Sequence, residues 1–207
     1  MWALVESGSV TKVYSRPRAL TIGDVSYPSN IFTMWSKDEL EALGIYEIEL
    51  DNSNYKDQTY YINTNQTFAF SSGKVTASYG TATAKNLDDT TYTSQDEEDG
   101  LIPEGKSVGD VKTHGLKWNH KQVIINQAYG LLQPNDWYVV RETEAGTAIP
   151  ADWTTFRSGV RSTAADMQSK INAVTTVDQL AALYEYNDAE PPVRPLGEWP
   201  QSPDKSV

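Results

Sequence analysis

Two histidines, His114 and His120, are the only imidazoles in this 207-residue sequence, which contains no cysteine. A spacing of six residues places two side chains about 120° apart around a helix, so they cannot bind one metal ion together from the same helix. Without cysteine there are no disulfides, no thiolate catalysis and no cysteine-ligated metal sites. The sequence therefore predicts neither a metal nor another cofactor.

The motifs of familiar enzyme classes are also missing. No serine lies in a Gly-x-Ser-x-Gly elbow, no glycine-rich loop matches a phosphate cradle, and no His-Glu-x-x-His pattern occurs. Among 28 acidic residues, some pair would by chance have the separation that glycoside hydrolysis requires. A Ser-His-Asp triad from distant positions is compatible with the sequence, but nothing supports one. We expect a protein that is not an enzyme.

The charge balance narrows the classes of partner. The chain has 17 basic and 28 acidic residues, a net charge of −11, which disfavours binding to nucleic acid or to an anionic membrane. No apolar run approaches the roughly 20 residues that span a bilayer. The first residues lack the basic start and long apolar stretch of a secretory signal. We therefore expect a soluble protein that does not insert into membranes.

Trp and Tyr are unusually frequent among the aromatic residues of this chain, which has 6 Trp, 12 Tyr and 4 Phe. Both types combine an apolar body with a polar atom, which suits thin β cores and protein interfaces. Tyr60 and Tyr61 form a possible glycan contact by ring stacking. The alternative is ordinary strand alternation, in which one tyrosine is buried and its neighbour is exposed.

The first 87 residues are predicted to form a β-rich domain. Residues 2–5 and 10–14 flank a short polar turn and predict a hairpin. Ser36 and Glu39 fit a capping box at the start of one short helix, which Gly44 would end. Further strands are predicted over residues 45–50, 60–62, 67–70 and 74–79.

Residues 88–110 are strongly acidic and are interrupted by glycine and proline. Such a segment buries little surface and repels itself, so we expect a flexible linker. It lacks the ligand alternation of an EF-hand loop, which argues against calcium binding.

Residues 111–190 are predicted to form a helical domain. One helix should end before Pro134, with Leu116, His120, Val123 or Ile124, Gln127 and Leu131 on one face. Residues 136–141 could form a strand or an extended clamp. From Trp153 to Val174, apolar residues recur at steps of three and four, which predicts a seam for a partner helix in this chain or in another copy. Arg157, Arg161, Asp166 and Lys170 should face solvent.

Thr176 and Gln179 predict a short helix near the end of this domain. Residues 191–207 are too rich in proline for regular structure and should run extended. Together these patterns predict an α+β protein with a β-rich N-terminal domain, an acidic linker, a helical domain and an extended tail.

Residues 131–141, Gly146, Ile149-Pro150, Trp153, Phe156-Arg157 and Arg161 resemble a module found near the C-termini of tail proteins of tailed bacteriophages. In that family a Leu-rich helix end and an Asp-Trp pair precede a loop, a proline and a helix with an aromatic-Arg step. The match covers about 40 residues, and the family more often has Tyr where this chain has Phe156. The rest of the chain, from Trp2 through Tyr27-Pro28 to Leu196-Gly197-Glu198-Trp199-Pro200, resembles small tail-region proteins of marine phages.

This resemblance implies a structural, non-enzymatic tail component, such as a fibre, baseplate or adaptor protein. The resemblance also implies assembly in the bacterial cytoplasm and a place in the virion, bound to other tail proteins. A homotrimer is one oligomeric state that it is compatible with. An assembly chaperone absent from the particle and a glycan-binding domain for host recognition are the alternatives. The candidate partner-binding residues are Trp137, Trp153, Phe156, Arg157, Val160, Arg161, Met167, Ile171, Pro195, Leu196 and Trp199.

Overall fold

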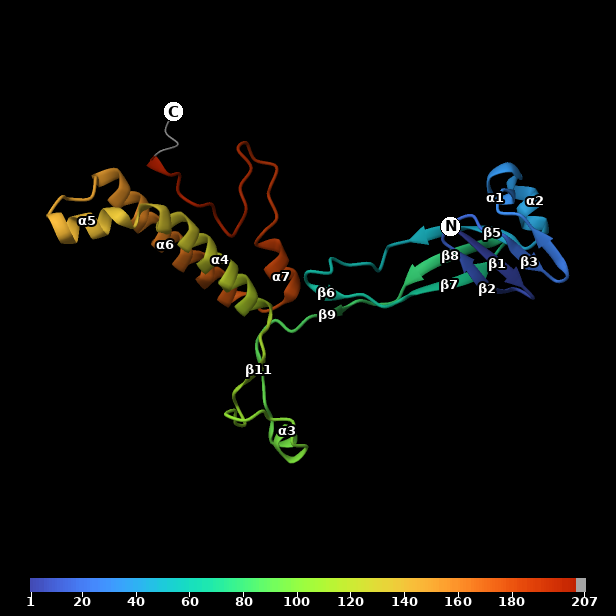
Figure 1. The fold of residues 1–207 in the computed structure, drawn as a ribbon, viewed down its shortest axis with the longest axis horizontal. Coiled ribbons are helices and arrows are strands. Elements are labelled where there is room, and N and C mark those ends of the chain that lie inside the picture. The colour runs from blue at the N-terminus through green and yellow to red at the C-terminus, as the bar shows by residue number, and fades with distance from the viewer. Residues whose placement is uncertain (204–207) are drawn as a thin grey trace. The chain divides into compact units, whose positions relative to one another are not determined.

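The structure is a computed structural model that describes residues 1–203 and divides the chain into two compact units. Unit 1 is Met1–Thr83 and unit 2 begins at Ala84 (Figure 1). Strands dominate unit 1 and helices dominate unit 2, which confirms the predicted α+β class. None of the helices described is long and apolar enough to cross a membrane.

Unit 1 is built on a five-stranded sheet in the order β2-β1-β5-β8-β7. The β5 and β8 strands pair in parallel and the other pairs are antiparallel. The edge strands β2 and β7 also come into contact, so the sheet is strongly curled. The strands are β1 (Trp2–Glu6), β2 (Ser9–Tyr14), β5 (Ile45–Asp51), β7 (Gln66–Ser71) and β8 (Lys74–Tyr79).

Shorter elements complete unit 1. The hairpin of β3 (Leu20–Ile22) and β4 (Val25–Tyr27) leads to α1 (Ile31–Met34) and α2 (Lys37–Ala42). A second small sheet pairs β6 (Tyr61–Ile62) with β9 (Thr83–Ala84).

The predicted capping box at the start of α2 is confirmed. The Ser36 hydroxyl accepts from the Glu39 amide, and the Glu39 carboxylate accepts from the Ser36 amide. Gly44 follows the helix with φ +79°, and a Cβ there would lie 2.7 Å from the carbonyl oxygen of Val5. Only glycine fits this turn without strain, so Gly44 closes the helix against β1.

Side chains on the two faces of the sheet enter separate apolar clusters, as strand alternation requires. Leu4 and Ile45 lie in the cluster covered by α1 and α2, together with Tyr14, Leu20, Ile31, Phe32 and Leu40. Ala3 and Ile48 face the other way and pack with Val75 and Ala77.

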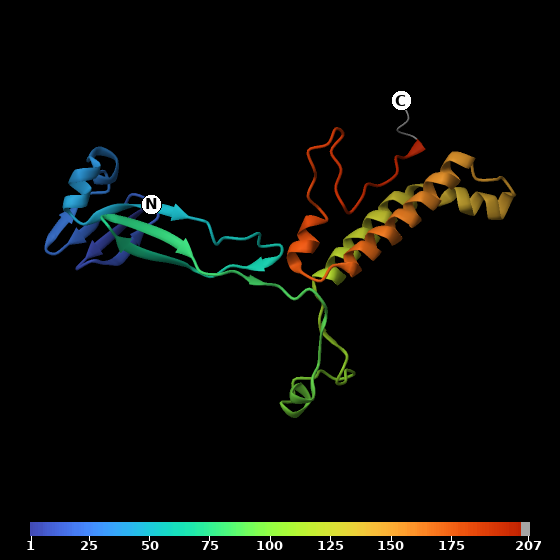
Figure 2. The same ribbon diagram turned by 180° about the vertical axis from the view of Figure 1, so that it is seen from behind.

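Unit 2 begins with a segment that we call the acidic arm, residues 88–113. It contains β10 (Thr90–Thr91), α3 (Ser94–Glu98) and β11 (Val111–Thr113), with β10 and β11 paired antiparallel. The helical part follows, and Figures 1 and 2 show α4 and α6 side by side. Its elements are α4 (Leu116–Leu132), the 3-10 turn η1 (Gln133–Asn135), α5 (Trp137–Ala145), α6 (Ala151–Ala173) and α7 (Val177–Ala182).

The predicted seam of α6 is confirmed, and its partner is α4 of the same chain. Ile124 of α4 is buried whereas Val123 is exposed, which resolves the two alternatives on that helix. The C-terminal end of α4 lies beside the start of α6, so the two helices run antiparallel. The buried seam residues are Trp153, Phe156, Val160, Ala164, Met167, Ile171 and Val174.

Three predictions about elements and their boundaries need correction. Residues 137–145 form a helix rather than a strand or clamp. The segment 88–110 is not an unstructured linker, because it carries a capped helix and one strand of a hairpin. The division between the units falls after Thr83, so this segment belongs to unit 2 instead of forming a separate part of the chain.

Candidate docking surface

The turn between α4 and α5 is built around one buried arginine. Arg157 of α6 is 6% exposed, although the sequence placed it in solvent. Its guanidinium donates to the carbonyl oxygen of Leu132 at 3.2 Å, to Oδ1 of Asn135, and to Oδ1 of Asp136 at 2.8 Å. Asn135 in turn donates to the carbonyl oxygen of Leu131 at 2.9 Å. Arg157 therefore satisfies acceptors at the end of α4 and fixes where α5 begins.

Aromatic rings continue from this turn toward the surface. Trp137 stacks on Tyr138 with ring centroids 3.9 Å apart, and Tyr138 lies 5.5 Å from Trp153. Trp153 meets Phe156 edge to face at 5.7 Å. These four rings form an aromatic run that extends from buried rings on α6 to the exposed ring of Trp137 on α5. The packing of Tyr138 against Trp153 therefore holds α5 against α6.

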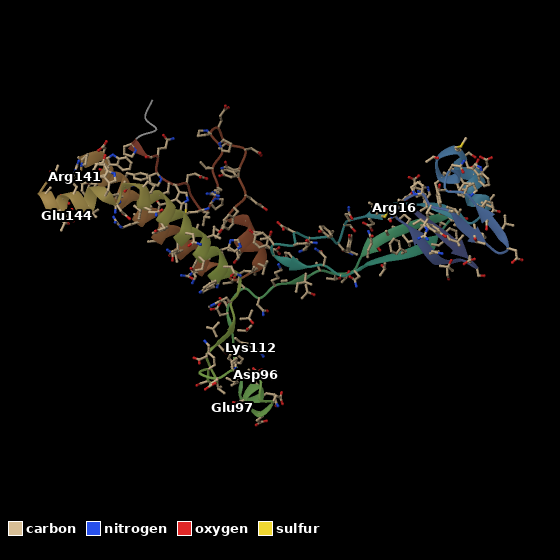
Figure 3. All side chains as sticks on the ribbon, viewed as in Figure 1. Arg16, Asp96, Glu97, Lys112, Arg141 and Glu144 are labelled. Carbon is tan, nitrogen blue, oxygen red and sulfur yellow. The ribbon has the colours of Figure 1, made fainter. Side chains whose placement is uncertain are left out.

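Arg141 supports the exposed end of this run. Its guanidinium carbon lies 4.9 Å from the Trp137 ring and 5.1 Å from the Tyr138 ring, which is cation–π distance. It also donates to the carbonyl oxygen of Ala148, while its buried Nε has no hydrogen-bond partner in the residues described. Figure 3 places Arg141 and Glu144 together on α5.

Trp137 and Val140 are three residues apart on α5 and so lie on the same side of this helix, which we call the α5 face. Trp137 is 51% exposed and Val140 is 52% exposed. None of the residues of α5 is buried, so this helix presents apolar surface that the described chain leaves uncovered. Large exposed apolar side chains gathered on one element are typical of protein-binding sites.

Most of the predicted partner-binding residues are buried within unit 2. Trp153, Phe156 and Val160 form one cluster against α4, and Met167 and Ile171 are fully buried. Of the predicted set, Trp137, Arg161 and Pro195 are exposed.

The tail residue Trp199 packs within unit 2. It lies against the cluster of Trp153, Phe156 and Val160, and its indole N–H donates to Oε1 of Gln127 at 3.1 Å. Leu196 is 1% exposed and is likewise held within the unit. Neither side chain is free to dock on another protein in this conformation.

The predicted glycan contact is half-buried. Tyr60 and Tyr61 are both partly exposed, so strand alternation does not separate them into one buried and one exposed ring. The ammonium group of Lys56 lies 4.3 Å from the centroid of the Tyr61 ring. The Lys56 ammonium group therefore covers one of the two ring faces on which a sugar could stack.

The two histidines have different partners and do not form a shared site. His114 Nδ1 pairs with the Asp89 carboxylate at 2.9 Å, and its ring stacks on Trp118 at 3.8 Å. His120 Nδ1 lies 2.7 Å from the hydroxyl of Tyr184, and burial lowers the pKa of His120 below its usual value. Within residues 1–203, no group of three His, Asp or Glu side chains could hold a metal ion.

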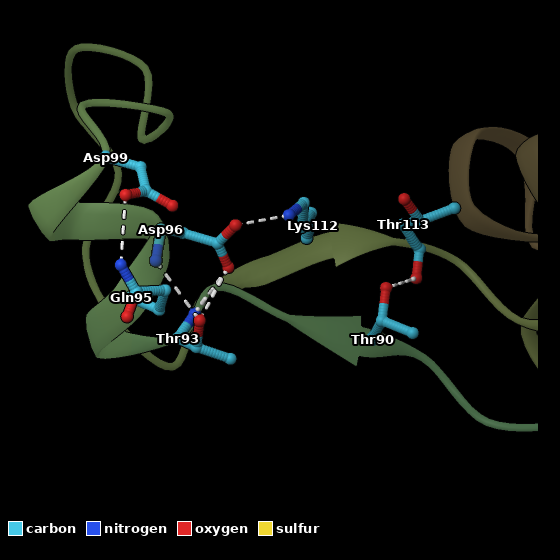
Figure 4. Close-up of polar contacts among 7 residues, drawn as sticks. All are labelled: Thr90, Thr93, Gln95, Asp96, Asp99, Lys112 and Thr113. Carbon is cyan, nitrogen blue, oxygen red and sulfur yellow. Dashed lines mark hydrogen bonds and ion pairs between the residues drawn. The ribbon is translucent and has the colours of Figure 1, made fainter.

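The acidic arm is organised around Asp96 (Figure 4). Its carboxylate accepts from the amide of Thr93 at 2.9 Å and from the ammonium group of Lys112. These donors, led by Lys112, lower the pKa of Asp96 to about 2. The pair ties α3 to β11, and the Thr-x-x-Asp spacing of the capping box was a signal that the sequence analysis missed.

Comparisons with protein-family models, with curated proteins and with solved structures find no match.

Proposed function

We propose that this chain is a non-enzymatic structural component of a bacteriophage tail, a fibre, baseplate or adaptor protein that docks on other tail proteins. The phage assignment rests on the sequence resemblance. The observation that supports docking is the α5 face, because Trp137 and its neighbours lie in solvent on a helix fixed from below by Arg157 and the aromatic run. A rigid, exposed tryptophan is the kind of residue that dominates binding energy at interfaces.

The charge distribution favours partner contact through the helical part. The α4 helix contains Lys117 and Lys121 and no acidic residue, in a chain whose net charge is −11. Trp118, Ile125 and Tyr129 are exposed on α4 at steps of seven and four residues, which places them along one stripe. Lys117 pairs with the carboxylate of Asp88 at 2.9 Å, so a partner that approaches this stripe meets apolar surface, the charge of Lys121 and no carboxylate from α4 itself.

Mass spectrometry of purified particles, with copy number referred to the major capsid protein, tests the assignment. A fixed stoichiometry, in multiples of three or six, is the expected result. Absence from particles together with presence in the infected-cell lysate would replace this proposal with the assembly-chaperone alternative. A homotrimer in solution, measured by light scattering, would account for a multiple of three.

Docking through the α5 face is tested with the purified protein and isolated tail complexes. Replacing Trp137 by Ser should weaken binding about 30-fold, the effect of losing a central tryptophan at an interface. Met34, which is more exposed and lies in unit 1, provides the matched control as Met34→Ser. Equal affinity of the Trp137 variant and the original chain would refute the assignment of this face.

A further inference from the structure

A small pocket lies in unit 1 beside the cluster that α1 and α2 cover. Its volume is about 250 Å³. Pockets for drug-sized ligands generally begin near 300 Å³, so this one is sized for a small head group. The pocket is lined by Trp2, Phe32, Trp35, Lys37, Leu40, Ile45 and Glu47.

Three aromatic rings reach this pocket from two separate parts of the fold. Trp2 lies on β1, and its ring is 4.9 Å from that of Phe32 on α1. Trp35 follows Phe32 by three residues, a spacing that brings side chains to the same side of a helical turn. The Trp35 ring is supported from behind by Tyr27, edge to face at 5.9 Å. The pocket therefore has aromatic walls whose positions are fixed by packing.

The carboxylate of Glu47 lies beside these rings. Glu47 on β5 is directly opposite Trp2 on β1 in the antiparallel register, so the two side chains are neighbours on the same face of the sheet. Within residues 1–203, Glu47 makes no ion pair and no hydrogen bond through its side chain. Its charge is available to a ligand in the pocket.

Two other charged side chains near Glu47 are in ion pairs. Lys37 at the rim contacts Glu41 of its own helix at 3.6 Å. Glu49, two residues beyond Glu47 on the same strand, accepts from Lys74 at 2.8 Å. Of the two charged side chains that line the pocket, Lys37 is in an ion pair and Glu47 is in none that involves residues 1–203.

We propose that this pocket binds a small quaternary or methylated ammonium group. Such a cation is attracted to the faces of Trp and Phe rings and, being weakly hydrated, loses little on entering an aromatic pocket. The Glu47 carboxylate adds Coulomb attraction for the cation and none for a neutral ligand of the same shape. This inference does not depend on the proposed tail function.

Titration with choline chloride, followed by the indole N–H signals in proton–nitrogen NMR spectra, tests the proposal on the full chain. Saturable shifts of the Trp2 and Trp35 signals are expected, with a Kd on the order of 1 mM for a ligand of this size. The neutral isostere 3,3-dimethylbutan-1-ol should bind at least about tenfold more weakly, because it lacks the charge. Equal binding of the two compounds, or no saturable shift, overturns the proposal.

Two variants and a matched control identify the residues. Glu47→Gln and Trp35→Leu should each weaken choline binding about tenfold, with folding checked by circular dichroism. Glu98→Gln removes an exposed carboxylate from α3 in unit 2, changes the net charge by the same amount, and should leave the affinity unchanged. If the two Glu variants weaken binding equally, the attraction comes from the overall acidity of the chain, and the site is refuted.

The source of the ammonium group is read from three titrations. Choline, phosphocholine and a trimethyllysine peptide all carry it, in a free solute, a lipid head group and a modified protein. The ligand with the lowest Kd identifies the source. If none of the three gives a saturable shift, the proposed pocket is refuted.

Discussion

Arg157 provides the sharpest test of how the helical part is held together. Replacing it with Met keeps most of the side-chain volume and removes three donated hydrogen bonds, to Leu132, Asn135 and Asp136. Because Asn135 is 2% exposed, its Oδ1 gains no water in exchange. A buried acceptor left without a donor costs about 1–3 kcal/mol.

The ion pair with Asp136 adds little to this cost. The Asp136 side chain is 53% exposed, so its charge stays solvated when the guanidinium is removed. The expected loss for Arg157→Met is therefore about 2–4 kcal/mol in the free energy of unfolding, most of it from the two carbonyl-type acceptors. This is a large part of the total stability of an ordinary domain, which is about 5–15 kcal/mol.

Urea denaturation followed by circular dichroism at 222 nm measures this loss, because the long helices that give the signal lie in unit 2. Arg161→Met is the matched control. Arg161 lies one turn further along α6, is exposed, and makes one long hydrogen bond of 3.5 Å to the carbonyl oxygen of Arg157. The control should change stability by less than about 0.5 kcal/mol. If the two variants unfold at the same urea concentration, the buried hydrogen bonds do not hold the turn and the reasoning fails.

Three further predictions concern other parts of the chain. Gly44→Ala should destabilise unit 1 more than Gly8→Ala: both glycines have φ +79°, but only the Cβ at position 44 meets a backbone oxygen, and thermal denaturation of the two variants compares them. The carboxyl carbon of Asp96 should titrate by NMR with a midpoint near 2. Since its pKa is lowered in the folded chain, the stability it gives the arm is present above about pH 4 and is lost as the pH falls toward 2, and a midpoint near 3.8 would contradict the pairing with Lys112. Burial lowers the pKa of His120, so the folded state binds fewer protons than the unfolded one below about pH 6.5, and stability should fall as the pH drops through that value. The fall in melting temperature between pH 7.5 and pH 5.5 should shrink in His120→Gln, and an unchanged fall would show that this histidine is not its source.

Local sequence signals predicted the elements that are stabilised locally. Ser36 and Glu39 begin α2 because the capping box needs only the four residues it contains. The three-and-four spacing from Trp153 to Val174 predicted α6 and its buried face for the same reason.

The errors came where distant residues decide the local structure. Residues 137–141 are rich in aromatic and β-branched side chains, which favour a strand. They form a helix because Arg157, about 20 residues further on, bonds the turn before it, and because Gly146 can end it with φ +66°. Arg157 itself was placed in solvent because an arginine is seldom buried unless its partners are known. In the acidic arm Lys112 pairs with Asp96, 16 residues earlier, a contact that composition alone does not reveal.

The order of strands in unit 1 has a consequence for how fast each unit forms. Strand β1 pairs with the central strand β5, more than 40 residues later, and β5 pairs in parallel with β8, about 27 residues further on. Sheets with such distant pairings generally fold in milliseconds to seconds, whereas helices packed against near neighbours fold in microseconds to milliseconds. Refolding from denaturant should therefore show a fast phase from the helices of unit 2 and a slower phase from the sheet. On the ribosome, unit 1 cannot complete its sheet until β8 has been synthesised.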